Sequence, residues 1–218
     1  MHYLYKQIDG ITGEELDEYL ASGWFRLRQE LISVFDRLNC YFWLRTIVNK
    51  VELQKTQQRV FRKAIKFHVE IINCTVTQEI EELWAHYKGF IDFEVARTVA
   101  MNIYDSEMHN QFNTKLVTVR DNEKLIAVGY FDVGKNSIAS ILHFYHQEYK
   151  KYSLGKYLLL IEMEYAIKNG INYYYTGYIN TLNSKYDYKL FCGKDAIEFY
   201  MKNEKKWIPW NSFKSDFI

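Results

Sequence analysis

The sequence predicts an α/β fold of the α+β kind: a mixed, largely antiparallel sheet flanked by helices, with a small module at the N-terminus. Two segments with apolar residues at three- and four-residue spacing, Gln78–Tyr87 and Phe93–Tyr104, predict helices. Three apolar strands follow between Lys115 and Tyr145, and the polar segment Arg120–Lys124 is typical of a hairpin between the first two. A turn at Ser153-Leu154-Gly155 then leads into an amphipathic helix.

The first 74 residues predict helices and strands of their own. Thr12 and Glu15 match a capping box, so a short helix begins there, and Gly23 ends it. Thr56 is placed to cap a later helix. A strand, this basic helix and a second strand complete the module: Cys40–Leu53, Gln57–Lys66 and Phe67–Thr75.

The strands of the remaining chain are Lys115–Val119, Leu125–Val133 and Ser137–Tyr145. The helix after the turn covers residues 156–168, and Asn169-Gly170 ends it. An aromatic strand, Tyr173–Tyr178, and a last strand, Ile197–Lys202, follow. We therefore expect two units, a small basic N-terminal module at residues 1–74 and the main domain at residues 75–218.

The charges are unevenly distributed, although the net charge is only +1. Residues 24–66 contain ten basic and three acidic side chains, a net charge of +7, whereas residues 67–112 have a net charge of −6. Such asymmetry indicates an anionic partner for the basic segment. A nucleic-acid backbone fits, because Lys and Arg release its counterions on binding; a solvated basic face is the simpler interpretation.

Three scattered cysteines, Cys40, Cys74 and Cys192, form no C-x-x-C pair, so we expect neither a metal site nor a disulfide framework. Reduced cysteines are typical of cytoplasmic proteins. A secretory signal pattern and an apolar run of about 18 residues are both missing, so we expect no membrane association. A single proline argues against disordered linkers. We expect a monomer.

The order of these elements is that of N-acetyltransferase-like folds. In such folds the third strand runs into a turn whose backbone amides face an acyl donor. The helix after the turn presents its positive N-terminal end to an anion. The position of Gly155, between the three strands and the helix, therefore predicts an acyltransferase.

The segment around the turn is more specific. Residues 144–157 read Phe-Tyr-His-Gln-Glu-Tyr-Lys-Lys-Tyr-Ser-Leu-Gly-Lys-Tyr, and residues 185–189 read Lys-Tyr-Asp-Tyr-Lys. This block resembles the arginyl-tRNA–protein and leucyl-tRNA–protein transferases, which have Phe-Tyr-Asp-Pro, Tyr-Arg, Ser-Leu-Gly-x-Tyr and Lys-Met-x-Tyr-Lys at this spacing. Those enzymes move an amino acid, Arg or Leu, from charged tRNA to the N-terminal residue (Asp or Glu) of a protein and so mark it for degradation.

Weaker matches lie upstream, at Gly23-Trp24-Phe25-Arg26, at Arg45 and at residues 56–63. The chain departs from the family pattern in three places, one of which is Leu27, where the family has the second Arg of the Gly-Trp corner. The family's cysteine cluster is reduced to Cys40, and the Asp-Pro and Arg before the turn are His146-Gln147 and Lys150. The resemblance therefore implies a divergent member of the family.

The chemistry of this transfer needs few special groups. The donor is an activated ester, and the acceptor α-amine has a pKa of about 8, so part of it is neutral at cell pH. Catalysis can then depend on positioning and on polarising the ester carbonyl. A general base adds a modest gain, and Asp132, His143 and Glu162 are the candidates. We expect no cofactor besides aminoacyl-tRNA as co-substrate.

The resemblance also implies binding residues. Cationic residues that match basic positions of the family would hold the acidic acceptor N-terminus: Arg45, Arg59 and Lys189. The turn and the aromatic and basic residues around it would bind the aminoacyl-tRNA: Lys150, Ser153, Leu154, Gly155, Tyr157, Tyr178, Lys185 and Tyr188. Core packing is an equal interpretation of the tyrosines.

Two other functions stay open on the sequence. An acyl-CoA-dependent N-acyltransferase would share the fold, although the usual acetyl-CoA turn is richer in glycine than residues 149–157. A non-catalytic relative that binds tRNA or protein is favoured by His146-Gln147 and by the lost cysteines.

Overall fold

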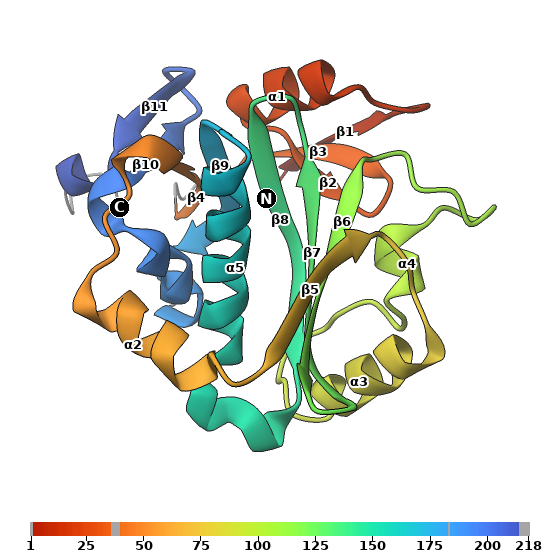
Figure 1. The fold of residues 1–218 in the computed structure, drawn as a ribbon. Helices are drawn as coiled ribbons and strands as arrows, with labels where there is room; N and C mark the ends of the chain where they lie inside the picture. Colours follow the sequence, from red (N-terminus) through yellow and green to blue (C-terminus); the bar gives the residue numbers. More distant parts are fainter. Residues whose placement is uncertain (1, 36–39, 183, 214–218) are drawn as a thin grey trace.

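The computed structural model describes residues 2–35, 40–182 and 184–213. Within them, an eight-stranded sheet has the order β11-β10-β4-β9-β8-β7-β6-β5, and a three-stranded sheet has the order β1-β3-β2 (Figure 1). The strands are β1 (His2–Gln7), β2 (Phe25–Leu27), β3 (Glu30–Phe35), β4 (Tyr41–Ile47), β5 (His68–Asn73), β6 (Thr114–Asp121), β7 (Lys124–Val133), β8 (Ser137–Tyr145), β9 (Tyr173–Asn180), β10 (Ile197–Met201) and β11 (Lys206–Pro209).

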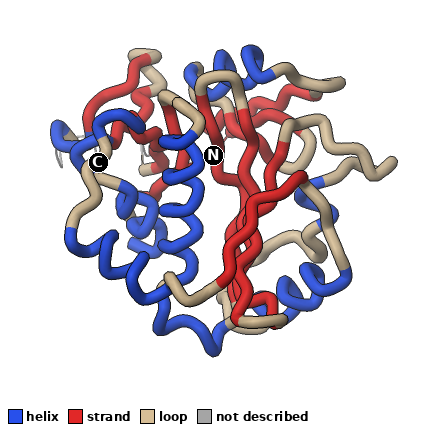
Figure 2. Tube along the Cα trace, in the orientation of Figure 1, coloured by secondary structure: helices blue, strands red, loops and turns tan. Residues whose placement is uncertain are grey.

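Helices cover both faces of the large sheet (Figure 2). The α-helices are α1 (Gly13–Ala21), α2 (Lys55–Ala64), α3 (Gln78–Lys88), α4 (Ala100–Ile103) and α5 (Leu154–Lys168). The 3₁₀ segments are η1 (Val48–Lys50), η2 (Gln147–Tyr152), η3 (Ser184–Cys192), η4 (Lys194–Ala196) and η5 (Trp210–Ser212). The fold class predicted from the sequence, a mixed, largely antiparallel sheet flanked by helices, is confirmed.

Successive side chains of each strand point to opposite faces of the large sheet, so the core has two layers, one on each face. Val117 of β6 and Phe131 of β7 pack with α5 and α2 on one face. Leu116, in the next position of β6, packs with α3 and α4 on the other face. α5 is buried along most of its length, so its position against β7 and β8 is fixed by packing.

β8 and β9 run parallel and separate after three residue pairs. Ser137–Ala139 of β8 pairs with Tyr173–Tyr175 of β9, whereas the other pairings of the large sheet are antiparallel. Beyond these pairs β9 continues alongside β4, and β8 continues alongside β7. A register shift between β7 and β8 leaves Ile141 as an extra residue, which increases the local twist. The main chains of β8 and β9 therefore diverge at Ser140 and Thr176.

Many elements predicted from the sequence are confirmed. The Thr12–Glu15 capping box is formed, and Gly170 has a positive φ of 65° next to the C-cap of α5. Strands are present within the predicted ranges 67–75, 115–119, 125–133, 137–145, 173–178 and 197–202, and the first and last of them are shorter than predicted, at His68–Asn73 and Ile197–Met201.

The helix predicted over Phe93–Tyr104 is wrong, since only α4 is helical. Side chains of α3 form hydrogen bonds with backbone groups of residues 96–100, just before and at the start of α4. The Glu81 carboxylate accepts from the backbone N–H groups of Val99 and Ala100, and Trp84 donates to the carbonyl of Ala96. Such bonds compete with the helical ladder.

Two boundaries in the N-terminal part were also predicted wrongly. The strand from Cys40 ends at Ile47, where the chain turns into η1 instead of continuing to Leu53. Thr56 lies inside α2 and is not its cap, because the N-cap position is Gln54 and the Thr56 hydroxyl donates to the side chain of Gln57. The sequence also gave no indication of β1, β2, β3 and β11.

The expected division of the chain into two units, at residues 1–74 and 75–218, stays a prediction. The large sheet, however, includes strands from both sides of it. β4 pairs with β9 and β10, and β5 pairs with β6. No helix in the described part of the chain is long and apolar enough to cross a membrane.

Candidate functional site

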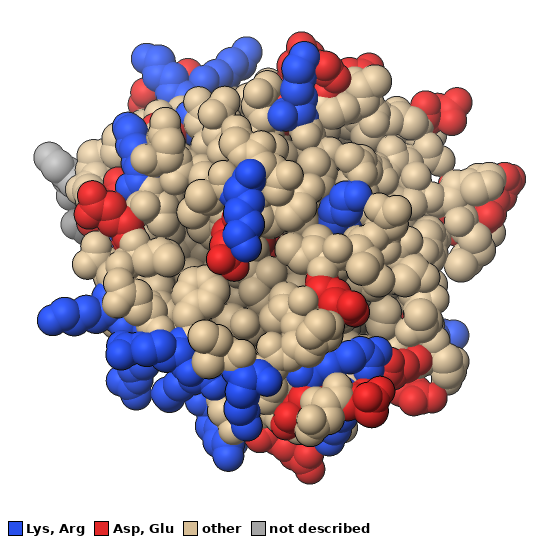
Figure 3. Space-filling view, in the orientation of Figure 1, with Lys and Arg blue, Asp and Glu red and all other residues tan. Residues whose placement is uncertain are grey.

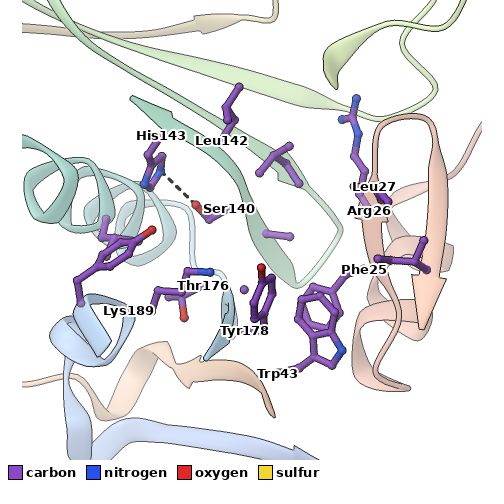
Figure 4. Close-up of a pocket in the computed structure, with 16 residues that line it drawn as sticks. Phe25, Arg26, Leu27, Trp43, Ser140, Leu142, His143, Thr176, Tyr178 and Lys189 are labelled. Atoms are coloured by element: carbon purple, nitrogen blue, oxygen red, sulfur yellow. Dashed lines mark hydrogen bonds between the residues drawn. The ribbon is translucent and has the colours of Figure 1, made fainter. Parts of the chain in front are cut away.

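Two cavities adjoin the point where β8 and β9 separate. The smaller one, about 220 Å³, lies between Ser140–His143 of β8 and Thr176–Tyr178 of β9 (Figure 4). The larger one, about 630 Å³, lies between the end of β8, the start of α5, η3 and the loop after α3. Both are lined by Ile141, Leu142, His143, Tyr188 and Lys189. The two cavities therefore meet at these residues.

Aromatic rings form one wall of the smaller cavity. Phe25 of β2 stacks on Trp43 of β4, with ring centroids 3.4 Å apart and an interplanar angle of 11°. Tyr178 meets Trp43 edge to face at 5.3 Å. Figure 4 shows these rings opposite Ser140 and His143 of β8. The cavity thus has an apolar, aromatic side and a polar side.

His143 is the first member of a buried hydrogen-bonded chain that continues through Glu162 of α5 to Tyr174 of β9. Its Nε2 lies 2.6 Å from Oε1 of Glu162 and 3.1 Å from Oγ of Ser140. The hydroxyl of Tyr174 donates to Oε2 of Glu162 at 2.5 Å. Burial and the neighbouring Glu162 raise the pKa of Tyr174 well above its ordinary value, so the hydroxyl remains a donor.

A glycine leaves the space for this pair. A Cβ at Gly129 of β7 would lie 3.2 Å from Cδ2 of His143 and 3.4 Å from Oε1 of Glu162. Two of the three predicted catalytic residues, His143 and Glu162, are therefore in direct contact. His143 faces both cavities, and Glu162 is fully buried behind it.

Asp132, the third predicted catalytic residue, lies elsewhere. Its Oδ1 accepts from Arg26 at 2.7 Å and from the hydroxyl of Thr114 at 2.6 Å, and its side chain is fully buried. Burial raises the pKa of Asp132, and the Arg26 guanidinium opposes that rise. Asp132 lines neither cavity, so the geometry gives it a role in attaching β2 to the sheet.

The predicted donor turn forms the start of α5. Ser153 has left-handed backbone angles, φ 57° and ψ 46°, and occupies the N-cap position without a capping side-chain hydrogen bond. Ser153 and Gly155 line the larger cavity. The N-terminal N–H groups and the helix dipole together favour a negative charge at such a position. This end of the cavity is therefore suited to an ester carbonyl or to phosphate.

The other predicted tRNA-binding residues divide between the cavities and the core. Lys150 and Lys185 line the larger cavity, Tyr178 lines the smaller one, and Tyr188 lines both. Leu154 is fully buried, and Tyr157 is buried against Phe61, so both are packing residues.

Lys189 is one of the three residues predicted to bind the acceptor, and it lines both cavities. Its Nζ lies 4.6 Å from the ring centroid of Tyr178. Gly177 has φ +99°, and a Cβ there would lie 2.8 Å from Nζ of Lys189. Desolvation lowers the pKa of Lys189 to about 8. The side chain thus holds a cation of weakened basicity at the junction of the cavities.

The other two predicted acceptor-binding residues do not line the cavities. Arg45 is bound to Glu198 at 2.7 Å and lies over the rings of Tyr173 and Trp207, at 4.4 and 4.5 Å. Arg59 is exposed on the outer face of α2.

A loop and η3 meet across the larger cavity. Lys185 forms an ion pair with Asp92, and its Nζ lies 4.1 Å from the ring centroid of Phe93. Nearby, the ring of His146 stacks on that of His86, with centroids 4.0 Å apart. The pKa of His146 is lowered, mainly by desolvation and to a smaller extent by charge repulsion from His86. His146, the substitution noted in the sequence, therefore packs beside the cavity.

Sequence reasoning missed Ser140, Trp43 and the partnership of Tyr174 with Glu162. One signal was available, because Ser140 and His143 are polar residues inside an otherwise apolar strand. In the described ranges, no three His, Cys, Asp or Glu side chains gather as metal ligands. The expectation that no cofactor is needed stays a prediction.

The sequence profile of the arginine-tRNA-protein transferase C terminus matches residues 68–194, a segment that lines the larger cavity and most of the smaller one. The chain belongs to this family. Among its relatives, an aspartate/glutamate leucyltransferase of Campylobacter jejuni subsp. jejuni (serotype O:6) is 28% identical over 200 residues, covering 84% of this chain and 81% of the relative. The protein of the same name from Saccharophagus degradans is 30% identical over 171 residues, covering 77% and 70%.

The solved structures that resemble the fold of this transferase family member include the C-terminal domain of a putative lysylphosphatidylglycerol synthetase from Agrobacterium fabrum, with a TM-score of 0.51 and 13% identity. The match covers 63% of this chain and 46% of that one, and it concerns the fold alone. The family assignment confirms the prediction of an aminoacyltransferase that uses charged tRNA.

Proposed function

We propose that this transferase moves leucine from charged tRNA to an acceptor protein that begins with Asp or Glu. The observation that carries the proposal is the meeting of two cavities at His143 and Lys189. A donor in one cavity and an acceptor in the other would bring the ester carbonyl and the α-amine together. Holding the two reactants in this way supplies much of the rate enhancement that such a transfer needs.

The larger cavity would hold the aminoacyl ester at the 3′ end of the tRNA. Lys150, Lys185 and the N-terminal end of α5 favour the negatively charged backbone there. Its apolar wall, which includes Trp84 and Val95, suits an aliphatic side chain.

Two observations favour leucine over arginine as the amino acid transferred. Asp92 is the one acidic side chain among the described residues that line either cavity, and Lys185 already pairs with it. A buried guanidinium needs a carboxylate partner, whereas a leucyl side chain needs none. The relatives are named leucyltransferases.

The smaller cavity would hold the N-terminal residue of the acceptor. Lys189 is placed to pair with its side-chain carboxylate, and the rings of Trp43 and Tyr178 provide the apolar contact. The relatives' names give aspartate and glutamate as their acceptors.

The proton leaves the amine through His143. Because Nε2 is directed at Glu162, Nδ1 is the nitrogen left to accept. The amine forms the new C–N bond, the C–O bond to the ribose breaks, and the proton passes to the departing ribose oxygen. Glu162, held by Tyr174, stabilises the imidazolium in the meantime, as a carboxylate does behind a catalytic histidine.

The test is an aminoacyl-transfer assay with the purified chain. Leucyl-tRNA and arginyl-tRNA are each combined with peptides that begin with Asp, Glu, Lys or Arg, and acetyl-CoA serves as a rival donor. We expect leucine on the Asp and Glu peptides only. The proposal fails if no aminoacyl-tRNA donates. In that case bound tRNA would favour the non-catalytic relative, and acetyl transfer would favour the acyl-CoA enzyme.

A further inference from the structure

A row of exposed cations follows α2 and continues on η2. Residues 53–67 include no acidic side chain. In Figure 3, Lys and Arg side chains gather over the lower left of the molecule, where Figure 1 places α2. We call these exposed residues the α2–η2 surface: Lys55, Arg59, Arg62, Lys63, Lys66, Lys150 and Lys151.

Packing holds these charges on the outside of α2. Gln57, Val60 and Ala64 are buried at helical spacing, and the amide of Gln57 donates to the carbonyl of Phe191 at 2.7 Å. The charged residues occupy the opposite face. Within the described ranges, none of the seven side chains forms an ion pair with an acidic residue, so their positive field extends into the solvent.

The surface is continuous with the larger cavity. Lys150 belongs to η2 and also lines that cavity. Phe67, just after α2, packs edge to face against Tyr149 and Tyr152 of η2, at 5.9 and 4.9 Å. Lys66 lies over the Tyr152 ring at 5.0 Å. These contacts fix α2 and η2 as one surface at the mouth of the cavity.

We propose that the α2–η2 surface binds the phosphate backbone of the double-stranded acceptor stem, while the single-stranded 3′ end enters the larger cavity. The inference rests on the proposed function. The exposed positions of α2 carry cationic and polar side chains and no aromatic ring. Phosphate contacts need only such cations, whereas single strands are held by stacking on aromatic rings as well.

The experiment compares two variants that each lose three positive charges. The first is Arg59→Gln/Arg62→Gln/Lys63→Gln. The control, Lys194→Gln/Lys205→Gln/Lys206→Gln, changes exposed lysines of η4, of the β10–β11 turn and of the start of β11. Figure 1 shows β11 at the upper left of the molecule and α2 at the lower left. The probes are uncharged tRNA, an acceptor-stem hairpin with its 3′ tail, the tail alone, and vesicles that contain phosphatidylglycerol.

We expect the α2 variant to bind tRNA and the hairpin roughly tenfold more weakly or worse. The slope of log K against log salt should fall by about 1 per lost contact. The α2 variant should bind the tail as the wild type does and keep its thermal stability. The control variant should bind tRNA and the hairpin with wild-type affinity. In the transfer assay KM for charged tRNA should rise, with kcat retained.

Unchanged hairpin affinity and salt slope in the α2 variant would overturn the inference. So would a result in which the three charges are needed for binding to vesicles and not for binding to RNA. The failure of the proposed function looks different. The wild-type chain would then transfer nothing, although its binding of uncharged tRNA could still depend on α2.

Discussion

At the scale of single residues, the charge of Lys189 should control the pH dependence of transfer. Desolvation lowers the pKa of Lys189 to about 8, so the cation that we propose pairs with the acceptor carboxylate is present below about pH 8 and is lost above it. The acceptor amine, with a pKa of about 8, becomes a better nucleophile over the same range. We therefore expect kcat/KM for peptides that begin with Asp to peak near pH 8 and to fall at higher pH.

Lys189→Arg tests this assignment, because a guanidinium keeps its charge throughout that range. The alkaline decline should disappear in the variant, while the rise toward pH 8 remains. The measurement is the pH profile of kcat/KM for both proteins. A decline that persists unchanged in Lys189→Arg would mean that another group titrates.

Gly177 gives a second prediction at this scale. It has φ +99°, and a Cβ there would lie 2.8 Å from Nζ of Lys189. Gly177→Ala should lower the free energy of unfolding by about 1–2 kcal/mol through backbone strain. It should also reduce kcat/KM roughly tenfold, because Lys189 must move.

Gly170→Ala is the matched control, since Gly170 has φ +65° and nothing within 4 Å of the added Cβ. It should lose a similar free energy of unfolding and keep its activity. Chemical denaturation and the transfer assay together separate strain from displacement. Equal losses of activity in the two variants would argue against a specific role of the Lys189 position.

At the scale of elements, the start of α5 is the predicted donor site. A Cβ at Gly155 would lie 3.5 Å from Cε1 of Tyr145, an ordinary contact, so Gly155→Ala should fold and transfer normally. Gly155→Trp should place an indole in the larger cavity and lower transfer by about 100-fold or more. The melting temperature should stay within about 2 °C of the wild type. Retained transfer in Gly155→Trp would exclude this turn as the donor site.

The elements also show which features a single sequence can reveal. The strands β6, β7 and β8 and the helix α5 were predictable because their apolar periodicity and turn residues are local signals. The motifs at residues 144–157 and 185–189 were recognisable because they resemble a family pattern. β1 was not, because its residues 3–7 are exposed, and β3 was not, because its buried residues Leu31, Ile32 and Ser33 are consecutive and give no alternating pattern. The two strands also pair across a distance in the sequence. The same holds for the site, since His143 and Glu162 were singled out separately. Their contact depends on α5 packing over β7, a tertiary relation that no local pattern encodes.

At the scale of the whole molecule, the small sheet is attached to the large one through a few buried contacts. Phe25 of β2 and Leu31 of β3 lie in one buried cluster with Leu16 and Leu20 of α1 and with Tyr175 of β9. The guanidinium of Arg26 crosses from β2 to Asp132 of β7. The same β2 carries Phe25 into the wall of the smaller cavity, so the placement of the small sheet and the shape of the proposed acceptor site are linked.

Removal of Arg26 should therefore affect both folding and function. Arg26→Met leaves Asp132 charged and buried without its cationic partner, which should cost about 3–5 kcal/mol of unfolding free energy at pH 7. Burial already raises the pKa of Asp132, and loss of the guanidinium raises it further. A carboxyl whose pKa is higher in the folded state than in the unfolded state binds its proton preferentially on folding. The stability deficit relative to the wild type should therefore shrink as the pH is lowered from 7 toward 5.

The double variant Arg26→Met/Asp132→Asn removes the buried charge altogether. It should regain part of the lost stability at pH 7, and its difference from the wild type should no longer depend on this titration. Denaturant unfolding at several pH values measures both effects. A deficit in Arg26→Met that is the same at pH 5 and pH 7 would show that the loss comes from other hydrogen bonds of Arg26, such as those to Ile103 and Asn110, and not from an unpaired Asp132. In either case a lower affinity for the acceptor peptide should accompany the loss of stability, because the position of Phe25 depends on the same strand.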